Sequence, residues 1–241
     1  MRESILERLA AAACGEHIPR VIEIGPGRGA LTKHLLPRTG ELHAIELDAE
    51  LASYLRNKFR DEPKLHIHEG NVLDADLAQW GPAVIAGNLP YYITSPVVHK
   101  FLDLDRRFDT AVFLMQREVA DRIVATPGTR DYGYLTVAAQ MICEVDLICK
   151  VSPEAFRPPP KVHSAGVRFK RRAQIPANVG EVLSFVSQCF ERKRKTLRNN
   201  LRAAYGTRID QFPEAGLRAE QLSIDQFIGL HQRLAGASGI S

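Results

Sequence analysis

The sequence lacks the features that would indicate a membrane or secreted protein. None of its apolar runs approaches the roughly 18–20 residues that a bilayer-spanning helix needs. The first residues contain no basic segment followed by an apolar core and a cleavage site, so no secretion signal is predicted. A short amphipathic helix is expected over residues 1–15 instead. We also find no internal repeat and no low-complexity tract.

Cysteine is scarce, and its spacing fits neither a zinc site nor a disulfide framework. The four cysteines form no C-x-x-C pair and are expected to be buried thiols in a reducing, cytoplasmic protein: Cys14, Cys143, Cys149 and Cys189. The histidines are scattered. His66 and His68 share one face of a predicted strand, but two ligands without a third do not predict a metal site.

The net charge of +4 is small, and its distribution along the chain is uneven. Residues 1–149 hold 16 basic and 21 acidic residues, whereas residues 150–241 hold 16 basic and 7 acidic residues. Hydrophobic residues at 45% and charged residues at 25% are typical of a globular protein with a buried core. The basic surplus near the C-terminus predicts contact with a polyanion.

Strand-like and helix-like segments alternate from about residue 20, which predicts an α/β fold with a mainly parallel sheet. The expected strands are Val21–Ile24, Leu42–Glu46, Leu65–His68, Ala83–Ala86, Thr110–Met115, Glu144–Val151 and Val162–Phe169. The alternation stops after Phe169, and Pro176 marks a linker. We therefore expect a sheet domain over residues 1–174 and a small all-helical domain over residues 175–241.

A glycine-rich loop after the first strand predicts a site for an adenosine-containing cofactor. Gly25, Gly27 and Ala30 fit the pattern G-x-G-x-x-G/A, which alone does not exclude NAD. Glu46 lies 21 residues beyond Gly25, at the end of the second strand, where a carboxylate can accept hydrogen bonds from ribose hydroxyls.

Two features favour S-adenosylmethionine over NAD. Glu23, just before the glycines, resembles the first motif of the class I (Rossmann-like) methyltransferases, and its carboxylate would face the cofactor's ammonium group. The sequence also has no dehydrogenase-like catalytic His downstream. Asn71, after the third strand, is expected to accept a hydrogen bond from the adenine amino group. Leu47 and Val72 complete the predicted cofactor contacts.

The most specific motif is Asn88-Leu89-Pro90-Tyr91, at the end of the fourth strand. It resembles the (D/N/S)-P-P-(Y/F) motif of enzymes that methylate exocyclic amino groups. An adenine amino group is a poor nucleophile because its lone pair is delocalised into the ring. The Asn88 side chain and the carbonyl of Leu89 or Pro90 can accept its two N–H bonds and favour a pyramidal nitrogen. Tyr91 can stack on the base.

These motifs lead to a close family resemblance: the chain resembles the ribosomal RNA adenine dimethyltransferases, specifically the KsgA-type small-subunit enzymes. The matching segments are Ile22–Thr32, Asn88–Pro96, Met115–Ile123, Asp131–Gln140, Val151–Phe169 and Phe190–Leu201. The resemblance implies dimethylation of two adjacent adenines in a terminal hairpin of small-subunit rRNA within an immature 30S particle. It implies a monomer that acts with S-adenosylmethionine and without a metal.

Carried over by position, the resemblance assigns further roles. Gly25, Glu46, Asn71 and Asn88 fall on cofactor-contacting positions, and Phe156 falls on the aromatic that covers the second face of the base. Two departures are expected to weaken cofactor binding. The family's Gly-Gln-(Asn/His)-Phe-Leu element is absent before the first helix, and Asn71 replaces the usual Asp, which removes charge assistance.

Two basic clusters are the predicted RNA contacts. One lies at the end of the last strand, and the other is expected on a helix: Arg168, Lys170, Arg171 and Arg172, and then Arg192, Lys193, Arg194, Lys195, Arg198 and Arg202. Basic side chains neutralise phosphates and release counterions.

Three alternatives stay open at this stage. One is the related large-subunit methyltransferase, whose loop more often reads Asn-Ile-Pro-Tyr. A non-catalytic RNA-binding assembly factor with the same fold is the second, and an NAD-dependent oxidoreductase is the most distant. The intact Asn88–Tyr91 loop argues against the non-catalytic factor.

Overall fold

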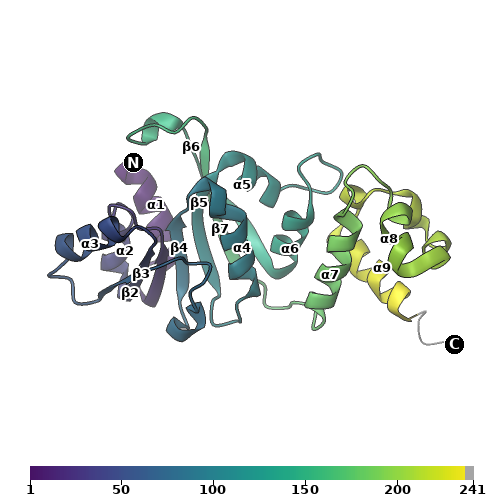
Figure 1. The fold of residues 1–241 in the computed structure, drawn as a ribbon, viewed down its shortest axis with the longest axis horizontal. Helices are drawn as coiled ribbons and strands as arrows, with labels where there is room; N and C mark the ends of the chain where they lie inside the picture. Colours follow the sequence, from purple (N-terminus) through teal and green to yellow (C-terminus); the bar gives the residue numbers. More distant parts are fainter. Residues whose placement is uncertain (237–241) are drawn as a thin grey trace. The chain divides into compact units, whose positions relative to one another are not determined.

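The computed structural model describes residues 1–236, and these residues form a seven-stranded sheet and several helices (Figure 1). The strands are β1 Ile18–Ile24, β2 Thr39–Glu46, β3 Leu65–Glu69, β4 Val84–Asn88, β5 Thr110–Gln116, β6 Cys143–Val151 and β7 Ser164–Arg171. The helices are α1 Glu3–Cys14, α2 Thr32–Leu35, α3 Ala49–Lys58, α4 Thr94–Asp103, α5 Arg117–Ile123, α6 Tyr134–Ile142, α7 Val179–Phe190, α8 Leu197–Tyr205 and α9 Ile224–Gly236. Single 3₁₀ turns include η2 Leu77–Trp80, η3 Tyr91–Ile93 and η4 Pro153–Ala155.

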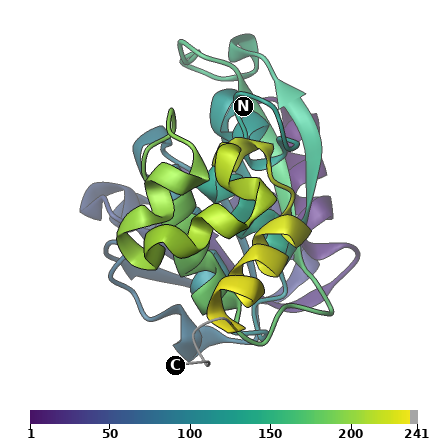
Figure 2. The same ribbon diagram turned by 90° about the vertical axis from the view of Figure 1, so that its right-hand side faces the viewer.

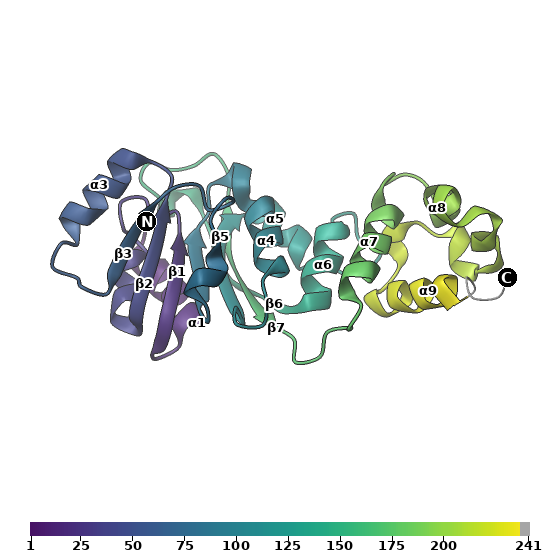
Figure 3. The same cartoon turned by 60° about the horizontal axis from the view of Figure 1, so that its bottom comes forward.

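The strand order is β3-β2-β1-β4-β5-β7-β6, and Figure 3 shows β3, β2 and β1 side by side in that order. The first five strands along this order are parallel, and β7 runs antiparallel between β5 and β6. The chain order reverses between β1 and β4. In an open α/β sheet, a ligand binds at the carboxyl ends of the strands beside such a reversal. The predicted α/β fold with a mainly parallel sheet is confirmed, and β7 is the strand that departs from the parallel direction.

Apolar side chains cover both faces of this sheet, as near-continuous apolar parallel strands require. On one face, Leu6 and Leu9 of α1 join a core that includes Val112 and Leu114 of β5. Because side chains alternate along a strand, Phe113 points to the opposite face. There it packs against Phe101 of α4, with ring centroids 6.3 Å apart.

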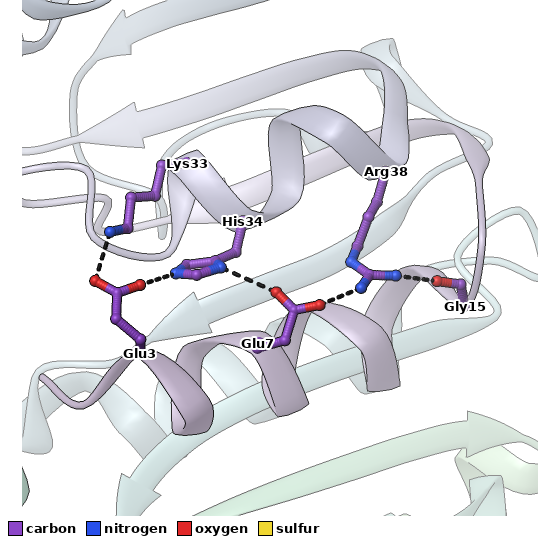
Figure 4. Close-up of polar contacts among 6 residues, drawn as sticks. All are labelled: Glu3, Glu7, Gly15, Lys33, His34 and Arg38. Atoms are coloured by element: carbon purple, nitrogen blue, oxygen red, sulfur yellow. Dashed lines mark hydrogen bonds and ion pairs between the residues drawn. The ribbon is translucent and has the colours of Figure 1, made fainter.

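A ladder of charged groups holds α1 against α2 and the turn that follows it (Figure 4). Glu3 accepts from Lys33 at 2.5 Å and contacts His34 Nε2 at 2.7 Å. Glu7 contacts His34 Nδ1 at 3.0 Å and pairs with Arg38. These partners lower the pKa of both glutamates. His34 therefore bridges two carboxylates on successive turns of α1.

The described chain divides by its contacts into two compact units. We call residues 1–120 with 143–171 the sheet unit, and residues 121–142 with those after Arg171 the helical unit. The sequence analysis placed one boundary after residue 174 and assigned 121–142 to the sheet. Tyr132, Val137 and Met141 instead share the helical unit's core.

The helical unit has its own hydrophobic core, formed by the green and yellow helices of Figure 2. Phe185, Leu201 and Phe227 from α7, α8 and α9 are almost completely buried in it. An insertion between β5 and β6 supplies α6 to this core, which a reading of consecutive segments does not reveal.

Candidate functional site

A cavity of about 480 Å³ opens at the carboxyl ends of β1, β2 and β3. Six predicted site residues line it: Gly25, Glu46, Leu47, Asn71, Val72 and Pro90. Sequence reasoning missed Asp48, Leu73, Tyr92 and Ile93, which also line it. Tyr92 is 77% exposed and Leu47 is 62% exposed, so both side chains are accessible to a ligand in the cavity.

Glu46 organises the floor of this cavity. Its Oε2 accepts a 2.9 Å hydrogen bond from the Gly27 N–H, and its Oε1 accepts a 3.1 Å bond from the Asp48 N–H. Gly25 and Gly27 have φ angles of 64° and 58°, a backbone region that favours glycine. The carboxylate thus fixes the glycine loop, and its remaining lone pairs can accept from a ligand's hydroxyls.

Glu23 is buried below the glycine loop, with 1% of its surface exposed, and it does not line the cavity. Its Oε2 accepts a 2.7 Å hydrogen bond from Thr32 Oγ1. Burial raises the pKa of the Glu23 carboxyl to about 7; the nearby Glu46 carboxylate acts in the same direction, and the Thr32 hydrogen bond opposes it. A cation brought near Glu23 would favour its charged form.

Asn71 is held in one orientation at the end of β3. Its Oδ1 accepts a 3.0 Å hydrogen bond from the Leu73 N–H, and its Nδ2 donates a 2.9 Å bond to Asp74 Oδ2. The amide oxygen keeps one lone pair for a further donor. An Asp at position 71 would instead set two carboxylates side by side, so Asn71 matches its neighbour Asp74.

The Asn88–Tyr91 loop follows β4, next to the glycine loop that follows β1. A Cβ added at Gly25 would lie 3.8 Å from Pro90 Cδ and 3.9 Å from the Asn88 carbonyl oxygen. Asn88 is exposed, whereas Leu89 is buried and its N–H donates to the Leu114 carbonyl at 2.9 Å. The loop is therefore anchored at Leu89 and presents the Asn88 side chain to solvent.

The carbonyl of Pro90 is already used within the loop. It accepts from the Ile93 N–H at 3.1 Å and from the Thr94 hydroxyl at 3.3 Å. The sequence left Leu89 and Pro90 as alternative acceptors for an amino group. The geometry favours the Leu89 carbonyl, because the Pro90 carbonyl has both of its lone pairs engaged.

Two aromatic residues of the predicted site, Tyr91 and Phe156, are half-buried in the sheet unit. Tyr91 Oη lies 3.0 Å from Ser164 Oγ, at the start of β7. Phe156 follows η4 and packs against the core on the α1 side of the sheet. Sequence reasoning missed Ser164, which is 73 residues from Tyr91 and belongs to no motif of its own.

The first basic cluster does not fit its predicted role. Arg171 is buried, and its guanidinium donates to the carbonyls of Phe101, Leu104 and Phe108 at 2.7–3.1 Å. The expected RNA contact at Arg171 is therefore wrong, because its donors satisfy the carbonyls that end α4. Arg168 and Lys170 are half exposed and pair with Asp146 and Asp109.

The strand pairing of Arg168 and Lys170 shows how far each lies from the Asn88–Tyr91 loop. Lys170 is paired with Thr110, the first residue of β5, whereas Ser164 is paired with Gln116, the last. Lys170 therefore lies at the end of the sheet opposite the Asn88–Tyr91 loop, and Arg168, paired with Val112, lies two residues farther along β5.

The second basic cluster was expected on a helix, but residues 191–196 form the turn between α7 and α8. Arg192, Lys193, Arg194 and Lys195 are all exposed in this turn, which we call the basic turn. Lys193 Nζ donates to the Arg130 carbonyl at 3.0 Å. Arg198 and Arg202, on α8, both pair with Asp210 at 2.7–3.0 Å. The positive charge of the basic turn is therefore less neutralised than that of Arg198 and Arg202.

The histidines form a stack on the sheet rather than a ligand set. His43 stacks on His66, His68 and Trp80, with ring centroids 5.0–5.2 Å apart. Burial lowers the pKa of His43 to about 4, with the Glu41 carboxylate acting in the opposite direction. Within residues 1–236, no three His, Cys, Asp or Glu side chains are arranged to hold a metal ion.

Comparisons with known proteins agree with this geometry. The sequence profile of the family described as "Ribosomal RNA adenine dimethylase" matches residues 3–235. The "Ribosomal RNA small subunit methyltransferase A" of Synechococcus elongatus is 41% identical over 95% of this chain and 89% of its own length. The protein of the same name from Acidobacterium capsulatum is 40% identical over 90% of this chain and 82% of its own.

Two solved structures extend the similarity to the fold of both units. A dimethyladenosine transferase from Plasmodium falciparum has a TM-score of 0.85 and 26% identity, covering 98% of this chain and 97% of that one. The 23S rRNA methyltransferase ErmE has a TM-score of 0.77 and 29% identity, covering 98% of both chains.

Proposed function

Because the chain belongs to the ribosomal RNA adenine dimethylase family, we propose that it transfers methyl groups from S-adenosylmethionine to N6 of two adjacent adenines. The target is a hairpin near the 3′ end of small-subunit rRNA, and the product is N6,N6-dimethyladenosine. One observation carries the proposal: the cavity floored by Glu46 and the Asn88–Tyr91 loop meet at the ends of the adjacent strands β1 and β4.

The residues present fit S-adenosylmethionine. Glu46 would accept from the ribose hydroxyls, the Asn71 amide oxygen would accept from the adenine amino group, and Leu47 and Val72 would contact the adenine ring. Glu23 is buried below the loop and does not line the cavity, so we propose no direct contact between its carboxyl and the ammonium group. When bound, the cofactor supplies an electrophilic methyl group on its sulfonium.

The Asn88–Tyr91 loop would hold the amino group for an in-line transfer. Asn88 Oδ1 and the Leu89 carbonyl accept its two N–H bonds, which favours a pyramidal nitrogen with its lone pair directed at the methyl carbon. Tyr91 and Phe156 would cover the two faces of the base. The rate then comes mainly from positioning, since the proton can leave after transfer.

We assign the RNA backbone to the helical unit, with the basic turn as its main contact. The exposed cations Arg192, Lys193, Arg194 and Lys195 carry this assignment, and Arg168 is a secondary candidate because Asp146 already neutralises it. The proposed partner is an immature 30S particle, bound by a monomer in the cytoplasm. Among residues 1–236, no helix combines the length and apolarity needed to cross a membrane.

A large-subunit target is the second candidate, supported by the structural similarity to the 23S rRNA methyltransferase ErmE. The small-subunit assignment is favoured because the curated relatives at about 40% identity carry small-subunit names.

The decisive experiment supplies labelled S-adenosylmethionine with undermethylated small subunits and, in parallel, with large subunits, followed by nucleoside analysis. We expect N6,N6-dimethyladenosine from the small subunits alone. Asn88→Ala should abolish product while subunit binding persists. Absence of dimethyladenosine with either subunit would refute the proposed activity, and product from large subunits alone would favour the second candidate.

A further inference from the structure

We propose that Ser164 is a positioning residue, which fixes the Tyr91 ring against the target adenine through a hydroxyl–hydroxyl hydrogen bond. This inference rests on the proposed function. Tyr91 Oη and Ser164 Oγ lie 3.0 Å apart, within the range of an O–H···O hydrogen bond in which either hydroxyl can donate.

The Ser164 end of this bond is rigid. Ser164 is 1% exposed and is the first residue of β7, the strand that lies between β5 and β6. It is paired with Gln116 on one side and with Val151 on the other. A hydroxyl carried by a strand that is paired on both sides has little freedom to move.

The Tyr91 end has little support of its own. Tyr91 begins η3, a 3₁₀ turn of three residues without a side-chain cap. Such a turn is held by few backbone bonds, here the bond from the Ile93 N–H to the Pro90 carbonyl. Because Tyr91 is only half-buried, packing restrains its ring in part, and the hydroxyl bond to Ser164 adds a restraint at the far end of the ring.

Ser164 also closes the segment that carries Phe156. That segment leaves β6 at Val151 and enters β7 at Ser164, and these two residues are paired with each other. One residue therefore sets the base of the Phe156 segment and the orientation of Tyr91. Stacking fixes the plane of the base, so a looser Tyr91 ring would misalign the amino group more than it would weaken RNA binding.

The test is a double-mutant cycle of Ser164→Ala and Tyr91→Phe, measured on undermethylated small subunits. Each variant removes one hydroxyl and keeps the surrounding shape. We expect each to lower kcat by roughly 2- to 13-fold, in line with one hydrogen bond, and the double variant to be no worse than either. KM for the subunits and the Kd for S-adenosylhomocysteine should stay within about twofold of wild type.

A matched control removes a hydroxyl from the neighbouring strand at its far end. Thr110→Val is an isosteric change at the first residue of β5, whereas Ser164 is paired with the last residue of that strand. It should leave kcat unchanged. Multiplicative losses in the double variant, or unchanged kcat in Ser164→Ala, would overturn the inference. Losses that instead follow a weaker Kd for S-adenosylhomocysteine would show a purely structural role and would overturn it too.

A spectroscopic readout tests the same restraint without turnover. Small-subunit rRNA with 2-aminopurine at the target position should be quenched by wild type through stacking, and less so by Ser164→Ala and Tyr91→Phe. Equal quenching in all three would contradict the inference. A wild-type chain without any dimethyladenosine product would remove the proposed function itself, whereas active variants indistinguishable from an active wild type would remove only the role of Ser164.

Discussion

Thr32 Oγ1 donates a 2.7 Å hydrogen bond to Glu23 Oε2 inside the protein, directly below the glycine loop. Thr32 is the first residue of α2, and Glu23 lies near the end of β1, so the bond spans the loop between them. Both residues are almost completely buried. The glycine loop is thus fixed from below by a carboxyl group whose pKa of about 7 lies near physiological pH.

Glu23→Gln should change the pH dependence of stability. The folded pKa of about 7 exceeds the ordinary value of 4.5, so the folded state binds the extra proton between these values. The contribution of Glu23 to stability is therefore present below about pH 4.5 and lost as pH rises through 7. In urea unfolding, the free energy of unfolding of Glu23→Gln should rise relative to that of wild type by roughly 3 kcal/mol between pH 5 and 8.

Glu50→Gln is the control for this measurement, because Glu50 is exposed on α3. Its difference from wild type should be flat over the same pH range. A flat difference for Glu23→Gln as well would contradict the buried, proton-binding state of that carboxyl.

Glu46→Ala should weaken cofactor binding through the loss of one carboxylate. The side chain now accepts from the Gly27 and Asp48 N–H groups and floors the cavity. Hydrogen bonds to a charged group contribute about 1.5–3 kcal/mol, so the Kd for S-adenosylhomocysteine should rise roughly 10- to 100-fold by calorimetry. Glu50→Ala should not change it, and an unchanged Kd in Glu46→Ala would show that the cavity binds something else.

Asn71→Asp should not restore the stronger contact that a carboxylate usually provides in this family. Asn71 Nδ2 donates to Asp74 Oδ2 at 2.9 Å, and the substitution would replace this bond by repulsion between two carboxylates. The single variant should bind S-adenosylhomocysteine no better than wild type. Asn71→Asp combined with Asp74→Asn should bind several-fold more tightly than the single variant, and an equal Kd for the two would contradict this account.

The sequence could predict that Gly25, Glu46 and Asn71 share one cavity because their spacing is local. Each strand, loop and helix follows directly in the chain, so Gly25, Glu46 and Asn71 could be placed on one sheet edge from their positions alone. Arg171 could not be assigned correctly, since its burial depends on α4 carbonyls some seventy residues away. Ser164 was missed for the same reason.

The helical prediction at residues 191–196 failed for a different reason. Its sequence, Glu-Arg-Lys-Arg-Lys-Thr, is rich in good helix formers and contains no glycine or proline. The turn forms because Leu197 is completely buried and α8 packs back against α7. Tertiary packing overrides local propensity here.

Charge reversal in the basic turn should weaken rRNA binding in a salt-dependent manner. Lys193→Glu with Arg194→Glu removes two cations, and the slope of log K against log salt should fall by roughly one for each lost phosphate contact. Arg171→Leu should leave that slope unchanged and lower Tm instead, because it deprives buried carbonyls of their donor. An unchanged slope in the double charge-reversal variant would contradict an RNA contact at the basic turn.

The histidine stack should make the protein sensitive to mild acid. The folded pKa of His43, about 4, lies below the ordinary 6.5, so the unfolded chain takes up this proton first. Stability from His43 is present above about pH 6.5 and is lost as pH falls toward 4, by roughly 3 kcal/mol. His43→Gln should flatten this loss in urea unfolding, whereas exposed His17→Gln should not, and parallel curves would contradict the assignment.

The ladder of charged groups connects α1 to the glycine loop through α2, although α1 itself does not contact the cavity. Glu3 and Glu7 hold the helix whose first residue, Thr32, is bonded to Glu23. We therefore expect a ligand that orders the glycine loop to disfavour local opening of α1 as well. Amide hydrogens of α1 should exchange more slowly with S-adenosylhomocysteine bound, although the cavity wall contains no residue of that helix.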